Sequence, residues 1–214
     1  KKNIVAIITA KANSKRIPGK NIKKFNGKPI IVNTIEKLKK SKIFDRIIVS
    51  TDSKKIAKIA AKCGAEIPFK RSKVLSNETT HATAVISDCV KFLIKENYKF
   101  DYVCCVYAPN PFLQIADLKT GFYKIKSKKY NYVFSATLYQ FPYFRSFTHL
   151  PQRGIKMLFK HNIKKRSQDI KKILCDAGQF YWGLKKAWLK KKNFFTKNSD
   201  IVMIPKWRYS DLDT

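Results

Sequence analysis

The chain has 214 residues, of which 44% are hydrophobic and 13% aromatic. This composition supports one folded domain with a real core and argues against a disordered chain. The 46 Lys and Arg residues outnumber the 14 Asp and Glu residues, giving a formal charge of +32. No run of 18 apolar residues occurs, so the sequence predicts no membrane span.

The basic charge first suggests a nucleic-acid-binding protein. However, the basic residues are 39 Lys and only 7 Arg, and residues 1–107 and 108–214 each carry +16. No tail or stripe concentrates the charge, and phosphate-binding surfaces favour the bidentate Arg fork. We therefore interpret most of the charge as a compositional bias, with a selected polyanion-binding surface as the alternative.

The cysteines and the first residues indicate the compartment. Five cysteines form no C-x-x-C pair, and three histidines have no ligand-like spacing. This pattern predicts reduced thiols in a cytoplasmic protein without a zinc site. The short apolar run at the start has the length of a strand and no small-residue cleavage site, so it does not resemble a signal peptide.

Strand and helix signals alternate along the first 140 residues. Apolar runs predict strands over 3–8, 46–50, 102–107 and 132–137. Helical spacing predicts helices that begin at Pro29, that run from Asp52 or Ser53 to Gly64, and that cover 79–95 and 116–126. Strands separated by helices form βαβ units, so the predicted fold is a three-layer, Rossmann-like α/β domain with a mixed, mostly parallel sheet.

Beyond residue 138 this alternation stops. Residues 139–147 are aromatic and follow neither period, and two further strands are predicted over 176–183 and 200–204. We interpret residues 1–214 as a single domain with an inserted arm at about 139–175. The aromatic segment either packs on a partner subunit or folds over its own core.

A basic loop, residues 9–21, follows the first predicted strand. In open parallel sheets, ligands bind at the carboxyl ends of the strands. The loop contains Lys11, Lys15, Arg16 and Lys20, together with the polar Ser14 and Asn21. Such a cluster suits a polyphosphate, although the loop contains neither a Walker A motif nor G-x-G-x-x-G. A solvated basic loop is the alternative.

The order of the motifs resembles a known family. The segments are S-K-R-I-P-G-K-N at 14–21, N-G-K-P-I-I at 26–31, F-D-R-I-I-V-S-T-D at 44–52, G-A-E-I-P-F-K-R-S at 64–72, A-P-N-P-F-L at 108–113 and S-D-L-D-T at 210–214. In this order they resemble the cytidylyltransferases that activate nonulosonic, sialic-type acids. R-S-Q-D at 166–169 and D-A-G-Q-F-Y-W-G at 176–183 most resemble the branch specific for pseudaminic acid.

The resemblance implies a fold of the nucleotide-diphospho-sugar transferase type and a reaction of CTP with a nonulosonic acid. The products are a CMP-sugar and pyrophosphate, Mg²⁺ is the implied cofactor, and a homodimer is the implied assembly. The implied CTP-binding residues are Lys11, Ser14, Lys15, Lys20, Asn21 and Arg71. Lys11, Lys20, Asp211 and Asp213 are implied to be catalytic, and both aspartates would also hold the metal, because alternating carboxylates on an extended chain project to one side.

The sugar acid requires a second set of residues. The candidates are Tyr107, Asn110, Arg166, Gln179 and Tyr181. Arg166 would bind the sugar carboxylate or phosphates, with Gln168 and Asp169 ordering its loop. Each of these residues also has a purely structural interpretation. We interpret Asp52 as a helix cap rather than a catalytic group.

Lys11 departs from the pattern of the family, whose members usually carry Arg there. Because Lys lacks the planar fork, we expect an active enzyme with a reduced rate. Three alternatives stay open: a cytidylyltransferase for sialic, legionaminic or deoxy-octulosonic acid, a basic nucleic-acid-binding homologue, and an inert homologue that only makes interactions. In the leading interpretation, the product would serve glycosylation of surface structures such as flagellin.

Overall fold

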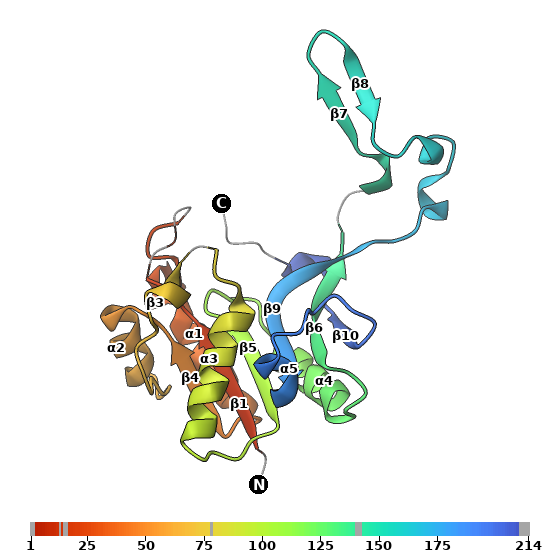
Figure 1. The fold of residues 1–214 in the computed structure, drawn as a ribbon. Helices are drawn as coiled ribbons and strands as arrows, with labels where there is room; N and C mark the ends of the chain where they lie inside the picture. Colours follow the sequence, from red (N-terminus) through yellow and green to blue (C-terminus); the bar gives the residue numbers. More distant parts are fainter. Residues whose placement is uncertain (1–2, 13, 15–16, 78, 140–142, 210–214) are drawn as a thin grey trace.

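A six-stranded sheet forms the centre of the molecule (Figure 1). The computed structural model describes residues 3–12, 14, 17–77, 79–139 and 143–209. The strands, in the spatial order β10-β6-β9-β5-β1-β4, are β10 Ser199–Met203, β6 Tyr132–Leu138, β9 Leu174–Leu184, β5 Tyr102–Tyr107, β1 Ile4–Thr9 and β4 Arg46–Ser50. In this sheet β9 is antiparallel to both neighbours, and the other pairs are parallel. The predicted mixed, mostly parallel sheet is confirmed.

Helices cover both faces of this sheet. They are α1 Ile30–Ser41, α2 Lys54–Lys62, α3 Ala82–Lys95, α4 Ile115–Lys126 and α5 Lys185–Leu189. Alternate side chains of β1 enter two separate core clusters: Ala6 and Ile8 pack with α1, α2 and α4, whereas Val5 and Ile7 pack with α3 and α5. Covering on both faces explains why β1 is a continuous apolar run rather than an alternating one. The three-layer architecture follows from this arrangement.

The residues at the amino ends of α2 and α1 show where each helix begins. Ser53 caps α2, because its Oγ accepts a hydrogen bond from the backbone N–H of Ile56 at 3.3 Å. The interpretation of Asp52 as the cap is wrong, since its Oδ1 accepts instead from the backbone N–H of Ala12 at 2.7 Å. The predicted start at Pro29 is one residue too early, because Pro29 is the cap residue with ψ of 133° and α1 begins at Ile30.

Several short elements connect the larger ones. β2 Lys24–Phe25 and β3 Lys28–Pro29 form a hairpin whose central Asn26 and Gly27 have φ values of 49° and 77°, as expected of an Asn-Gly turn. The 3₁₀ turns are Lys20–Ile22, Val74–Ser76, Tyr143–Arg145, Lys160–Asn162, Ser167–Asp169 and Lys206–Arg208. Across the described ranges, no helix combines the length and the apolar character that a membrane crossing requires.

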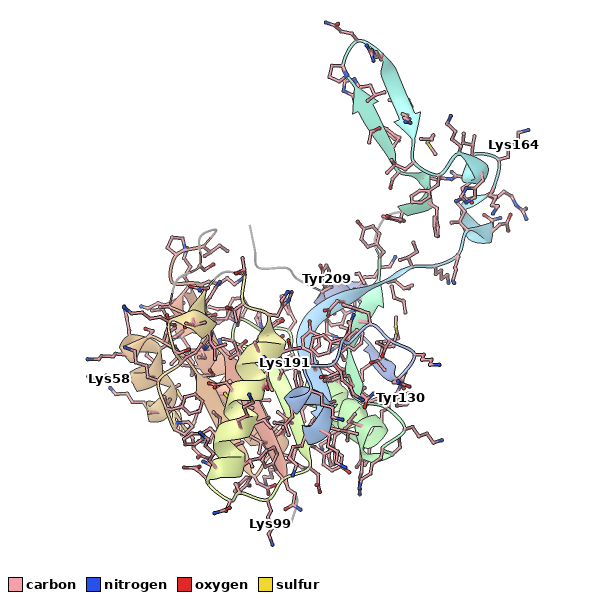
Figure 2. The ribbon with its side chains drawn as sticks, viewed as in Figure 1. Lys58, Lys99, Tyr130, Lys164, Lys191 and Tyr209 are labelled. Atoms are coloured by element: carbon pink, nitrogen blue, oxygen red, sulfur yellow. The ribbon has the colours of Figure 1, made fainter. Side chains whose placement is uncertain are left out.

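An arm leaves the sheet after β6 and returns at β9 (Figure 1). It carries an antiparallel hairpin of β7 Phe147–Leu150 and β8 Gly154–Met157, which stands away from the body. Figure 2 shows side chains crowding the sheet body but spreading into open space along this arm. Every residue of β7 is exposed, so the hairpin does not fold over the core of its own chain. Residues 140–142 of the predicted aromatic segment lie outside the described residues.

Candidate active site

Three adjacent parallel strands end at one edge of the sheet. Thr9, the last residue of β1, lies opposite Ser50 of β4 on one side and Tyr107 of β5 on the other. The loops that follow therefore start side by side. We call these three carboxyl ends and their loops the strand-end edge. Ligands of open α/β sheets bind at such an edge.

The basic loop follows β1 at this edge. Asn21 near its end is 7% exposed, and its Nδ2 donates a hydrogen bond to the Lys11 carbonyl at 2.8 Å. Lys11, Ser14 and Lys20 are half-buried and lie on the loop as predicted. The predicted Lys15 lies outside the described residues. The described cations of the loop are thus Lys11, two residues after β1, and Lys20, in the 3₁₀ turn that ends the loop.

Arg71 lies at the end of β4 but is only 5% exposed. Its Nε donates to Ser50 Oγ at 3.0 Å, its Nη2 donates to the Ser50 carbonyl, and its backbone N–H donates to the Thr51 carbonyl at 2.9 Å. Burial lowers the pKa of the guanidinium, and the nearby carboxylates of Asp52 and Asp88 oppose that shift. The side chain that the sequence predicted to reach a nucleotide is therefore buried and bonded to the end of β4.

The structure brings four of the five predicted sugar-binding residues together. Asn110 Nδ2 donates to the Gln179 carbonyl at 2.7 Å, and the Tyr107 and Tyr181 rings meet edge to face at 5.6 Å. The Tyr181 hydroxyl donates to Asp176 Oδ2 at 2.6 Å. Burial raises the pKa of both tyrosine hydroxyls, so both are neutral near pH 7. These residues line the end of β5 and the facing stretch of β9.

The end of the described chain passes beside this group. Gln179 Nε2 donates to the Arg208 carbonyl at 3.0 Å, while Gln179 Oε1 is buried and has no hydrogen-bond partner within the described residues. The Arg208 side chain forms an ion pair with Asp117 of α4. The predicted metal ligands Asp211 and Asp213 lie outside the described residues.

Arg166 is not part of this site within one chain. It lies on the arm, where its Nε donates to Asp169 Oδ2 at 2.8 Å, and both side chains are exposed. Gln168 is exposed on the same turn. Within one chain the structure does not bring Arg166 together with the other predicted sugar-binding residues, because Arg166 lies between β8 and β9 on the arm, which stands away from the body (Figure 1).

The cysteines are free thiols, as predicted. Cys89, Cys104 and Cys105 are buried in the core, and burial raises the pKa of Cys89 to about 12. Such protonated thiols are poor nucleophiles and poor metal ligands. Among the residues that the structure describes, no three His, Cys, Asp or Glu side chains gather into a possible metal site.

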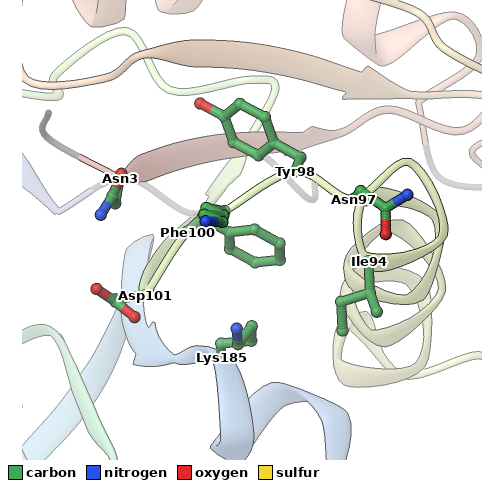
Figure 3. A pocket seen from close by; sticks show the side chains of 8 residues that line it. Asn3, Ile94, Asn97, Tyr98, Phe100, Asp101 and Lys185 are labelled. Carbon is green, nitrogen blue, oxygen red and sulfur yellow. The ribbon is translucent and has the colours of Figure 1, made fainter.

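An open pocket of about 500 Å³ lies at the opposite end of the sheet (Figure 3). It is bordered by Asn3 and Asp101, which directly precede β1 and β5, and by Lys185 at the start of α5. The Lys185 ammonium lies 5.2 Å from the centre of the Phe100 ring. Because the pocket adjoins the amino ends of the strands, it contains none of the predicted site residues.

Sequence reasoning missed three polar residues that shape the strand-end edge. Asp52 binds the basic loop, Asp176 binds Tyr181, and Asp117 holds Arg208. The role of Asp52 could have been inferred from the sequence, because Asp52 closely follows a buried strand and the neighbouring Ser53 can supply the helix cap. Asp117 pairs with a residue 91 positions away, which no local pattern encodes, whereas Asp176 lies on the same strand as Tyr181, five residues before it.

The family of the chain is shown by comparison with known proteins. A family model described as Cytidylyltransferase matches residues 5–177. The chain is also 38% identical over 210 residues to the pseudaminic acid cytidylyltransferase of Campylobacter jejuni subsp. jejuni serotype O:2, covering 98% of this chain and 90% of the relative. The fold is that of an α/β protein with a mixed, mostly parallel sheet, and the chain belongs to the cytidylyltransferase family.

Two further likenesses fit this family. A Helicobacter pylori protein described as pseudaminic acid cytidylyltransferase and UDP-2,4-diacetamido-2,4,6-trideoxy-beta-L-altropyranose hydrolase is 32% identical, with 97% of this chain and 40% of that protein covered. The solved structure of a CMP:2-keto-3-deoxy-manno-octonic acid synthetase complexed with CTP has a TM-score of 0.68 at 14% identity and covers 94% of this chain and 90% of its own. The structural match shows the same fold.

Proposed function

We propose that this chain transfers CMP from CTP to the anomeric hydroxyl of a nonulosonic acid, and that the acid is pseudaminic acid. The observation that carries the proposal is the 38% identity, over 98% of the chain, to a pseudaminic acid cytidylyltransferase. Independent support comes from the strand-end edge, where a basic loop lies beside a group of buried amides and tyrosines. The first suits a triphosphate and the second suits a polar sugar.

The reaction forms one phosphorus–oxygen bond and breaks another. The anomeric oxygen attacks the α-phosphorus, pyrophosphate leaves with the bridging oxygen, and the hydroxyl proton passes to solvent. Such reactions depend on positioning and on neutralising the charge of the leaving group. We assign Lys11, Ser14, Lys15 and Lys20 to the triphosphate, with Lys11 and Lys20 nearest to the charge that develops on pyrophosphate.

Asn21 and Arg71 are assigned to the nucleotide in different ways. Asn21 Nδ2 is already bonded to the Lys11 carbonyl, so its Oδ1 is the atom that would accept a hydrogen bond from the nucleotide. The Arg71 guanidinium is bonded to Ser50. Arg71 therefore acts by fixing the end of β4 against which the nucleotide would lie.

Mg²⁺ is the proposed cofactor, with Asp211 and Asp213 as its protein ligands. Carboxylate oxygens are the hard ligands that Mg²⁺ takes in proteins, usually together with substrate phosphates. When bound, the ion would neutralise phosphate charge. The last described residues support this assignment, because the Arg208 carbonyl accepts a hydrogen bond from Gln179, one of the residues assigned to the sugar acid.

Tyr107, Asn110, Gln179 and Tyr181 are assigned to the sugar acid. Asn110 and Gln179 are 3% and 5% exposed and bonded to the backbone of other segments, so their positions are fixed before any ligand arrives. Gln179 Oε1 has no donor among the described residues, and the N-acyl and hydroxyl groups of a nonulosonic acid carry such donors.

A homodimer formed through the arm is the proposed assembly. Phe147, Ile155 and Met157 share one face of the hairpin, because His149 pairs with Ile155 and Phe147 pairs with Met157. Phe147 and Ile155 are 56% and 62% exposed. An isolated two-stranded hairpin has only marginal stability in water. Contact of this exposed apolar face with a second copy would stabilise it. The assignment of Arg166 to the sugar requires that the arm meet the strand-end edge of a second copy.

The test is pyrophosphate release from CTP against a panel of pseudaminic, legionaminic, sialic and deoxy-octulosonic acids. We expect release with pseudaminic acid above all, and loss of release when Mg²⁺ is chelated. Faster release with another acid would overturn the branch assignment, and no release with any acid would overturn the function. Lys11→Arg should raise the rate, and no gain would remove the argument from the missing planar fork.

The proposed substrates suggest where the protein acts. CTP is made inside the cell, so we propose that the protein works in the cytoplasm, in line with its free thiols. A Campylobacter coli protein described as post-translational flagellin modification protein B is 38% identical over 122 residues, 56% of this chain. We propose flagellin glycosylation as the use of the product, and disruption of the gene should then reduce the mass of flagellin.

A further inference from the structure

One peptide group of the basic loop is held by side chains on both sides. The carbonyl of Lys11 accepts a hydrogen bond from Asn21 Nδ2 at 2.8 Å. The N–H of Ala12 donates to Asp52 Oδ1 at 2.7 Å. This carbonyl and this N–H belong to the same planar peptide group. Its orientation is therefore fixed at both ends.

The bond from Ala12 continues the pairing of β1 with β4. The last main-chain hydrogen bond between them runs from the Ala10 N–H to the Ser50 carbonyl at 3.0 Å. In a parallel ladder the next donor would be the Ala12 N–H, and the next acceptor would be the carbonyl of Asp52. The Asp52 side chain takes the place of that carbonyl. A charged acceptor makes this rung stronger than a neutral one.

The helix that follows does not account for Asp52. Ser53 supplies the cap of α2, so the helix has no need of the neighbouring carboxylate. A carboxylate beside a triphosphate site is unfavourable by itself. Here it is offset by the Ala12 N–H and by the Arg71 cation, which interacts with Asp52 electrostatically. The Asp52 carboxylate thus bonds the loop rather than capping the helix that follows it.

We infer that Asp52 is a positioning residue which, together with Asn21, orients the Lys11–Ala12 peptide group and so aims the Lys11 ammonium at the CTP phosphates. The inference rests on the proposed function for the triphosphate site. The direction in which the Lys11 side chain leaves the backbone depends on the peptide groups around it. Release of the Ala12 N–H would let this peptide group rotate and would spread the Lys11 ammonium over many positions.

The first test compares Asp52→Ala with Asp52→Asn, using Ser53→Ala as the matched control. Asp52→Ala should weaken CTP binding, measured by calorimetry, about tenfold or more, the size expected from losing a hydrogen bond to a charged group. Asp52→Asn keeps an acceptor oxygen and should stay within about threefold of the unaltered protein. By NMR, the Ala12 amide proton should exchange faster in Asp52→Ala alone. Ser53→Ala should lower stability without changing CTP affinity.

A double-mutant cycle separates positioning from a general structural role. If Asp52 acts through Lys11, Asp52→Ala should weaken CTP binding far less in a Lys11→Met background than in the unaltered protein. Equal losses in the two backgrounds, or unchanged CTP affinity in Asp52→Ala, overturn the inference. If the unaltered protein binds CTP but releases no pyrophosphate with any acid, the proposed function fails while the cycle on CTP affinity still decides the role of Asp52. Failure to bind CTP overturns both.

Discussion

The strand-end edge and the arm are both extensions of the same sheet, but they are held in opposite ways. At the edge, Asn21, Asn110 and Gln179 are each less than 8% exposed and bonded to the backbone of another segment. On the arm, Phe147 and Ile155 are more than half exposed. The edge is organised by contacts within the chain, whereas the apolar face of the arm has no counterpart in the described chain. The proposed function assigns a small molecule to the first region and a second copy of the chain to the other.

Truncation of the fully buried core at the opposite end of the sheet from the strand-end edge should have the largest effect on stability. Trp188 is fully buried, packs against Tyr132 and Phe194, and donates from Nε1 to the Val103 carbonyl at 3.2 Å. Trp188→Ala should lower the free energy of unfolding by about 3–5 kcal/mol. Chemical denaturation measures this change. Trp207→Ala, at a residue 76% exposed, is the control and should change stability by less than about 1 kcal/mol. Equal losses would contradict the burial described here.

The second largest loss of stability is expected from breaking the ion pair between Arg208 and Asp117. The Arg208 and Asp117 side chains are 10% and 14% exposed. Arg208→Met leaves the Asp117 carboxylate buried without its partner and should cost about 3 kcal/mol in denaturation experiments. The double variant Arg208→Met, Asp117→Leu should recover most of that loss, because a buried pair can be replaced by apolar side chains at little cost. No recovery would show that Arg208 stabilises through other contacts.

Substitutions on the arm should change the assembly of the protein rather than its stability. Charges placed on its apolar face by Phe147→Asp with Ile155→Asp should change the unfolding free energy of the body by less than about 1 kcal/mol, since both side chains are exposed. They should also halve the mass in light scattering if the arm joins two copies. Thr148→Asp, on the opposite face of the hairpin, is the control and should leave the mass unchanged. A monomeric unaltered protein would remove the proposed dimer.

The smallest effect is expected at the ion pair of the arm. The Arg166 and Asp169 side chains are 72% and 47% exposed. Solvent screens such pairs, so Asp169→Asn should change the unfolding free energy by less than about 0.5 kcal/mol. A clear loss of catalytic rate with unchanged stability would instead place this turn near the sugar in the assembled enzyme. Thermal unfolding and pyrophosphate release, measured on the same samples, separate the two results.

Much of the fold follows from local patterns. The strands β1, β4, β5 and β6 were predictable because helices cover both of their faces and leave continuous apolar runs. The antiparallel direction of β9 was not, since direction depends on how the chain returns to the sheet. β9 arrives from the arm without a crossover helix, and such a direct return permits antiparallel pairing with β6.

The position of strand ends in the sequence located one part of the candidate site. The basic loop and Tyr107 come directly after or at the end of strands in sequence, so the rule for parallel sheets located them. Arg166 shows the limit of this reasoning. Its motif lies between two strands that pair with each other, and the sequence does not reveal that the intervening segment projects from the body.

The two ends of the arm are hydrogen-bonded neighbours. Leu138 pairs with Leu174, and the Tyr139 N–H donates to the Ile173 carbonyl at 2.9 Å. The entry and the exit of the insert therefore lie about 5 Å apart, the spacing that a tight turn spans. Because closing a longer loop between fixed ends costs little extra entropy, the arm can change in length and content without altering the sheet. For protein engineering, the arm is therefore a segment that can be exchanged while the paired strands at its base stay as they are.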